Sequence, residues 1–233
     1  MKRILSLAIM STALLIGNAC AADDGGAAAA PEEINHPDSI YYTHPDFYNM
    51  PSTDGRIILP HYPTYQQTSD YSCGSAAALT VLNYFGNHDF DEATLIKRMK
   101  TKPEIGTSLS NMIKFFKEIG WEVQSSLDKP PMEDDEFQKF VVKNLSQGNS
   151  ILVENVEFGG HWRVIIGYDE IGTPDDTYDD VLIFADPFDT SDHKQDGYTS
   201  GSFDRFYSMW FDAHMLPKKE RNQPWLIATP RRS

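Results

Sequence analysis

Apolar residues follow a helical spacing in the first half of the folded region and form short, dense runs in the second half. A period near 3.6 predicts helices, whereas short runs rich in β-branched and aromatic residues predict strands. We expect helices over residues 73–85, from Asp89 or Asp91 to Lys100, from Thr107 or Ser108 to Glu118, over 134–146, and a helix-like segment over 202–211. We expect strands over residues 121–125, 150–155, 161–168, 181–185 and 225–228. Helices that precede an antiparallel sheet indicate the α+β class.

The first twenty residues have the pattern of an export signal. Lys2 and Arg3 precede an apolar run over residues 4–16, which is shorter than the roughly 20 residues that a membrane-spanning helix needs. Cys20 lies within a small-residue cleavage site, or is itself the lipidated first residue of a lipoprotein. We therefore expect a periplasmic, outer-membrane or secreted protein. The expected divisions are a signal peptide over 1–21, a linker and N-terminal arm over 22–56, and one folded domain over 57–233.

The charge of the chain excludes some classes of partner. The 233 residues include 34 acidic and 20 basic side chains, for a formal charge of −14. Nucleic-acid binding requires a basic face, and anionic lipid headgroups attract basic segments. We therefore expect no nucleic-acid partner and no adsorption to anionic lipid headgroups, and we expect the acids to serve solubility. We also expect no transmembrane domain, because the apolar run over residues 4–16 is too short to span a membrane.

Cys73 becomes a solitary thiol in the mature protein if Cys20 is removed or acylated. Exported proteins usually oxidise their cysteines in pairs, so a single thiol is either an inert buried residue or one that is kept for its chemistry. Cys73 also opens an apolar, alanine-rich helix. The free N–H groups and partial positive charge of a helix N-terminus stabilise a thiolate over a thiol.

Gln67 lies six residues before Cys73 in a loop. Its side-chain amide and the Cys73 backbone N–H are candidates for an oxyanion hole, in which each donor lowers a barrier by about 3–4 kcal/mol. Gly74 leaves the approach to the sulfur open. The alternative for this segment is a buried structural cysteine beside a surface glutamine.

His161 and Asp186 are the candidate partners of the thiol. His161 begins an apolar strand, where a neutral imidazole can accept the thiol proton and an imidazolium can stabilise the thiolate. Asp186 ends the next apolar strand and precedes Pro187, so its carboxylate can hold the second imidazole nitrogen. The structural alternatives are an edge histidine and an Asp-Pro strand terminator. The order Cys73, His161, Asp186 suits acyl transfer.

The residues around these positions resemble the bacteriocin-processing, or double-glycine leader, peptidase family. The resemblance runs over residues 57–212 and rests on Gln67, Cys73-Gly74, His161-Trp162 and Asp186-Pro187. It implies a papain-like fold, an oxyanion-hole role for Gln67, and a Cys73–His161–Asp186 triad that cleaves peptides through a thioester, with no cofactor. Relatives that mature bacteriocins are usually fused to a membrane-spanning exporter and have a shorter loop between the histidine and the aspartate. The substrate is therefore left open.

Other functions remain open at this point. The same triad suits an amidase or a transpeptidase, and a non-catalytic binding module is a third class. Acidic loops offer oxygen ligands for a stabilising calcium ion, although Lys194 and Phe203 break the EF-hand order, and the scattered histidines give no zinc spacing. The acids concerned are Asp175, Asp176, Asp179, Asp180, Asp189, Asp192 and Asp196.

Overall fold

The computed structural model describes residues 38–231, so the predicted signal peptide and Cys20 lie outside the described residues. The helices are α2 (Cys73–Tyr84), α3 (Glu92–Arg98), α4 (Leu109–Glu118), α5 (Asp134–Ser146) and α6 (Phe203–Ser208), with 3-10 turns η1 (Glu157–Gly159) and η2 (Lys218–Glu220). The strands are β1 (Arg56–Ile58), β2 (Glu122–Ser125), β3 (Ile151–Asn155), β4 (His161–Asp169), β5 (Val181–Ala185), β6 (Tyr198–Ser202) and β7 (Trp225–Thr229). The predicted α+β class is confirmed.

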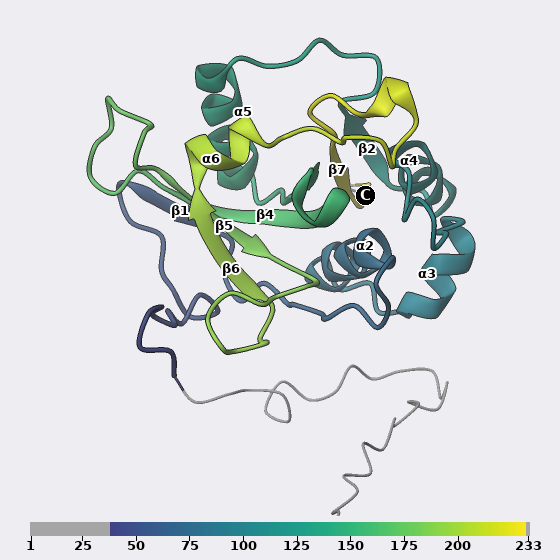
Figure 1. Cartoon of the computed structure of the whole chain (residues 1–233), viewed down its shortest axis with the longest axis horizontal. Coiled ribbons are helices and arrows are strands. Elements are labelled where there is room, and N and C mark those ends of the chain that lie inside the picture. The colour runs from purple at the N-terminus through teal and green to yellow at the C-terminus, as the bar shows by residue number, and fades with distance from the viewer. Residues whose placement is uncertain (1–37, 232–233) are drawn as a thin grey trace, which may run out of the picture.

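The strands of the described region form one seven-stranded antiparallel sheet. Its order is β2-β7-β3-β4-β5-β6, and β1 pairs with the end of β4 (Figure 1). The last strand, β7, therefore lies between β2 and β3, so the sheet is complete only when the end of the domain has joined it. The register pairs Asn155 with His161 and Val164 with Ala185.

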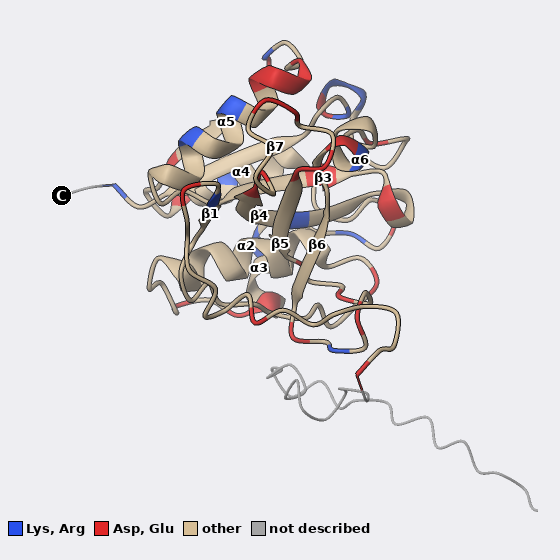
Figure 2. Ribbon diagram, turned by 90° about the vertical axis from the view of Figure 1, so that its left-hand side faces the viewer, with Lys and Arg blue, Asp and Glu red and all other residues tan. Residues whose placement is uncertain are grey.

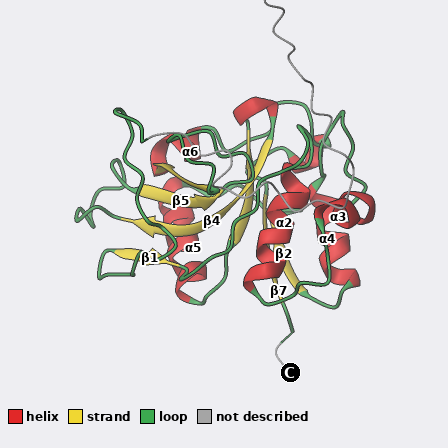
Figure 3. Ribbon diagram, turned by 90° about the horizontal axis from the view of Figure 1, so that it is seen from below, coloured by secondary structure: helices red, strands yellow, loops and turns green. Residues whose placement is uncertain are grey.

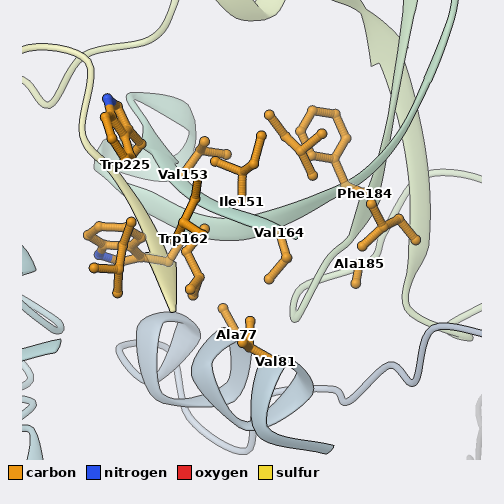
Figure 4. Close-up of a cluster of buried hydrophobic side chains, with 14 of the residues drawn as sticks. Ala77, Val81, Ile151, Val153, Trp162, Val164, Phe184, Ala185 and Trp225 are labelled. Carbon is orange, nitrogen blue, oxygen red and sulfur yellow. The ribbon is translucent and has the colours of Figure 1, made fainter. Parts of the chain in front are cut away.

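Helices cover both faces of the central strand β4. Successive side chains of a strand point to opposite faces, and Figure 4 shows Trp162 and Val164 on the side that faces Ala77 and Val81 of α2. On the other face of the sheet, Phe184 of the neighbouring strand β5 packs against Phe206 of α6, with 5.5 Å between the ring centroids. Figures 1 and 3 show α2 on one side of β4 and α5 with α6 on the other. The all-buried burial pattern of β3 and the nearly all-buried pattern of β4 agree with this double cover.

Two of the predicted helix starts correspond to actual N-caps. The Asp91 side chain accepts a hydrogen bond from the Thr94 N–H, and the Ser108 side chain accepts one from the Asn111 N–H. These bonds satisfy N–H groups that a helix N-terminus leaves without partners.

Two strands were not predicted, and two helices are shorter than expected. Helix α3 ends at Arg98, two residues before the predicted Lys100, which has a positive φ. β6 has the polar sequence Tyr-Thr-Ser-Gly-Ser at the edge of the sheet, and β1 is only three residues long, so neither shows an apolar alternation. The segment predicted over 202–211 is helical only to Ser208, because Phe211 is extended and bridges Asn222. β5 and β6 carry no charged side chain, and acidic residues gather in the neighbouring loops (Figure 2).

Candidate active site

Cys73 is the first residue of α2, as the sequence indicated, and its side chain is buried. A tight turn precedes it, in which the Ser72 N–H and Oγ both donate to the Ser69 carbonyl at 3.2 and 3.0 Å. The backbone N–H of Cys73 belongs to the first helical turn and has no intrahelical acceptor. The helix therefore directs its free donors and positive end toward the sulfur.

Gly74 allows the start of α2 to approach the sheet closely. A Cβ at this position would lie 2.7 Å from the Thr107 Cβ and 3.1 Å from the Trp162 Cδ1. Trp162 is itself fixed by a 2.9 Å hydrogen bond from its Nε1 to the Thr107 carbonyl. The glycine therefore sets the position of the cysteine against β4, and its role extends beyond access to the sulfur.

His161 and Asp186 form the buried pair that the sequence predicted. His161 Nε2 lies 2.7 Å from Asp186 Oδ1, which leaves Nδ1 for another partner. The Cys73 side chain lies close enough to the same imidazole to raise its pKa. Burial alone would lower the pKa of His161, but the Asp186 carboxylate, together with Cys73, raises it to about 10. The imidazolium form is thus favoured at neutral pH.

Asp186 stays ionised although it is buried. Burial would raise the pKa of Asp186, but the charge and hydrogen bond of His161, the charge of Arg163 and the Phe188 N–H lower it to about 2. The Phe188 N–H donates to Oδ1 at 2.9 Å, and the Thr199 hydroxyl donates to Oδ2 at 3.2 Å. The Arg163 guanidinium lies 3.6 Å from Oδ2. These contacts fix both carboxylate oxygens while one of them holds the histidine.

Gln67 is tied to the segment that follows Asp186. The Gln67 N–H donates to the Pro187 carbonyl at 2.8 Å, and the neighbouring Gln66 side chain donates to the Asp186 carbonyl at 2.8 Å. The Gln67 amide nitrogen donates to the Ser69 carbonyl at 2.8 Å, and the amide oxygen is buried with no hydrogen-bond partner in the described chain. One amide N–H is left over, so the oxyanion role of Gln67 stays a prediction.

Glu92 of α3 holds the loop that leads to Cys73, a contact that no sequence pattern indicated. Its carboxylate accepts hydrogen bonds from the Thr68 N–H at 3.1 Å, the Thr68 hydroxyl at 2.6 Å and the Tyr65 hydroxyl at 3.3 Å. Glu92 is buried, so these donors replace the water that its carboxylate would otherwise bind.

Two further acids, Glu154 and Asp212, line a cavity of about 80 Å³ together with Cys73. Neither residue was expected at the site from the sequence. Glu154 is the one charged residue in the apolar strand β3, and a charge within such a run was the available signal. Asp212 lies in an irregular segment after α6, where no pattern distinguished it.

The aspartates considered for calcium make contacts within the protein. Asp192 and Asp196 lie 2.8 and 3.3 Å from the two ring nitrogens of His44. The buried Asp189 accepts hydrogen bonds from the Ser191 N–H and the Gly197 N–H, each at 3.2 Å. Within residues 38–231, no group of three or more His, Cys, Asp or Glu side chains is arranged to hold a metal ion.

A helix-borne cysteine beside a histidine and an aspartate of an antiparallel sheet defines a papain-like cysteine peptidase. Residues 60–214 match the Peptidase_C39 like family, so the chain belongs to that family and is a cysteine peptidase. Among curated proteins, no significant match is found. No helix in the described range is long and apolar enough to cross a bilayer.

Two solved structures show the same fold. The peptidase domain of Streptococcus ComA, a bifunctional ABC transporter, is 19% identical with a TM-score of 0.51, over 73% of this chain and 100% of that one. A double-glycine-motif protease from an AMS/PCAT transporter, in complex with a leader peptide, is 17% identical with a TM-score of 0.51, over 78% of this chain and 98% of that one. The predicted papain-like fold and the family resemblance are thereby confirmed.

Proposed function

We propose that this protein is an exported cysteine peptidase that cleaves peptide bonds with a Cys73–His161–Asp186 triad. The observation that carries the proposal is the buried 2.7 Å bond between His161 and Asp186, with Cys73 acting on the same imidazole from a helix N-terminus. A thiolate, a base and a group that orients the base are the three parts that nucleophilic acyl transfer requires.

The first half of the reaction forms a thioester. The Cys73 thiolate attacks the carbonyl carbon of the scissile bond, and the carbonyl oxygen becomes an oxyanion. The Cys73 N–H and the remaining amide N–H of Gln67 donate to this oxyanion. The C–N bond then breaks, the leaving nitrogen takes the proton from His161 Nδ1, and the acyl group stays on the sulfur.

The second half regenerates the enzyme. His161, now neutral, accepts a proton from water as the water oxygen attacks the thioester carbon. The C–S bond breaks, the acid product leaves, and the thiolate–imidazolium pair is restored. Asp186 keeps its bond to Nε2 throughout, so Nδ1 always faces the sulfur and the substrate.

Cleavage by the mature protein tests the proposal. A mixture of peptides is incubated with the wild type and with Cys73→Ala, and the products are identified by mass spectrometry. We expect cleavage only with the wild type, and a trapped acyl adduct on Cys73 after acid quenching. Wild type that folds and leaves every peptide intact would refute peptidase activity. Products joined to an added amine would instead identify a transpeptidase.

Export is part of the same proposal. The basic start, the apolar run over 4–16 and the small residues around Cys20 support a cleaved signal peptide. Mass spectrometry of the protein from its native host is expected to show loss of the first 19–21 residues, with an acyl mass on Cys20 if it is lipidated. An intact N-terminus would refute export.

A further inference from the structure

Glu154 and Asp212 are two buried acids with oxygens that lack partners beside the nucleophile. Glu154 is 1% exposed and Asp212 is 4% exposed. Both oxygens of Glu154 and the Oδ2 of Asp212 accept no hydrogen bond within the described residues. Both residues line the same cavity as Cys73. Buried carboxylates normally have donors. A proton shared between the two acids supplies one hydrogen bond, and the remaining acceptor positions face the cavity, where the donors of a ligand can reach them.

Gly160 lies where the two carboxylates converge. A Cβ at this position would lie 3.0 Å from the Glu154 Oε1 and 3.1 Å from the Asp212 Oδ2. The two oxygens therefore face one point next to the residue that precedes His161. A side chain at position 160 would occupy the space between them, and glycine leaves it to a ligand.

The local charge matches one added cation. The Asp212 Oδ1 accepts the Leu216 N–H at 2.9 Å and lies 3.5 Å from the Arg221 Nε. Arg221 is anchored by its own hydrogen bonds to the Leu216 and His214 carbonyls. With both acids ionised, Glu154, Asp212 and Arg221 together carry one negative charge. A single positive charge would neutralise them.

The pair is stable without a ligand because it can hold a proton. Burial, followed by the charge of Asp212, raises the pKa of Glu154 to about 10. The protonated Glu154 can donate to Asp212 in the free enzyme, and a cation with several N–H donors can replace that proton. Glu154→Gln therefore resembles the free state in charge and shape, and we expect this variant to fold.

We propose that Glu154 and Asp212 form a specificity site for a primary ammonium group of the substrate, adjacent to the scissile bond. The cavity is small, and Tyr71, Trp162 and Met215 in its wall are suited to cover an aliphatic stem behind the ammonium. A lysine side chain and a free N-terminal amine share this chemistry. The assignment to a substrate rests on the proposed peptidase function, whereas ammonium binding at the pair does not.

Protection of Cys73 from alkylation tests the site without any turnover. The mature protein is treated with iodoacetamide in the presence of n-propylammonium chloride, or of 1-propanol and sodium chloride at the same ionic strength. We expect the ammonium to slow Cys73 modification at least threefold, and the alcohol to leave the rate unchanged. Glu154→Gln and Asp212→Asn should each lose the protection, while Glu122→Gln, a change to an exposed acid on β2, keeps it. Equal effects of ammonium and alcohol, or protection retained in both variants of the pair, would overturn the proposal.

Paired peptides then identify the source of the ammonium. In the first pair, one peptide has lysine beside the cleaved bond and the other has norleucine at the same position. In the second pair, one peptide has a free N-terminus one residue from the cleaved bond and in the other this N-terminus is acetylated. We expect kcat/KM to be at least tenfold higher for the charged member of one pair, and the difference to vanish in Glu154→Gln. Protection without hydrolysis of any peptide would refute the peptidase and support the ammonium site. Hydrolysis with no preference in either pair would refute the site as a substrate determinant.

Discussion

Replacement of Asp186 by asparagine is the most direct test of the candidate triad. The change keeps the shape of the side chain but removes the charge that accepts the 2.7 Å bond from His161. Neither orientation of an asparagine amide suits the site, because the amide nitrogen faces the Phe188 N–H at the Oδ1 position and the Arg163 guanidinium at the Oδ2 position. Where the nitrogen takes the Oδ1 position it donates to Nε2, which places the imidazole proton on Nδ1, toward the sulfur. In that tautomer the histidine cannot accept the thiol proton.

The expected magnitude follows from the His161 pKa. Asp186 and Cys73 raise it from 6.5 to about 10 against the effect of burial, a preference for imidazolium of about 5 kcal/mol. Without Asp186, burial lowers the His161 pKa and only Cys73 still raises it, so the neutral imidazole is favoured more strongly. A thiol with no cationic partner and an ordinary pKa of about 8.5 is only about 0.3% ionised at pH 6. We therefore expect the alkylation rate of Cys73 at pH 6 to fall about 100-fold.

The assay compares iodoacetamide modification at pH 6 with peptide cleavage. For Asp186→Asn we expect kcat/KM to fall by about 10³–10⁴, the size of loss that this change causes in a Ser-His-Asp triad. Asp189→Asn is the matched control, because Asp189 is a buried acid three residues along whose hydrogen bonds go to Ser191 and Gly197. The reasoning fails if Asp186→Asn is alkylated within threefold of the wild-type rate, or if Asp189→Asn slows alkylation as strongly.

Three further outcomes can be measured by urea denaturation. The pKa of Asp186 is lowered from 3.8 to about 2, which stabilises the fold above pH 4, and this gain is lost as the pH falls through 2. The pKa of His161 is raised from 6.5 to about 10, which stabilises the fold below pH 6.5, and this gain is lost as the pH rises through 10. The stability difference between wild type and Asp186→Asn should therefore be greatest at pH 4–6.5, at about 2–5 kcal/mol, the range given by the Asp186 and His161 shifts, and a pH-independent difference would contradict it. Gly74→Ala should cost about 1–3 kcal/mol, because the added methyl meets Thr107 at 2.7 Å; an unchanged midpoint would show that the helix can shift. Glu92→Gln should cost about 1–3 kcal/mol, because the amide cannot accept every donor that the carboxylate holds, and equal stability would mean that the loop is fixed by other contacts.

Local sequence patterns were sufficient for most of the fold and for the residues that now form the pair. Helix α5 and strand β5 have the predicted bounds, because each is a single periodic run between clear breaks. His161 and Asp186 were identified because each lies at the end of an apolar strand. β6 was missed because a polar edge strand is held by its neighbour β5, and that pairing leaves no alternation in its own sequence.

The residues that surround the pair could not be predicted in the same way. Glu92 supports a loop from another helix, and Asp212 meets Glu154 only after the segment behind α6 folds back over β3. These contacts depend on how separate elements meet in space. A strand's own composition cannot show which distant carboxylate, hydroxyl or arginine will face it.

The position of β7 has a consequence for when the enzyme becomes active. Cys73 lies early in the domain, and its base begins a strand whose neighbour β3 also pairs with β7, at the end of the domain. Contacts of such high sequence separation form late and slow the folding of a chain. We expect nascent or partly unfolded molecules to carry an ordinary, weakly reactive thiol, so the order in which the sheet forms limits self-digestion during synthesis.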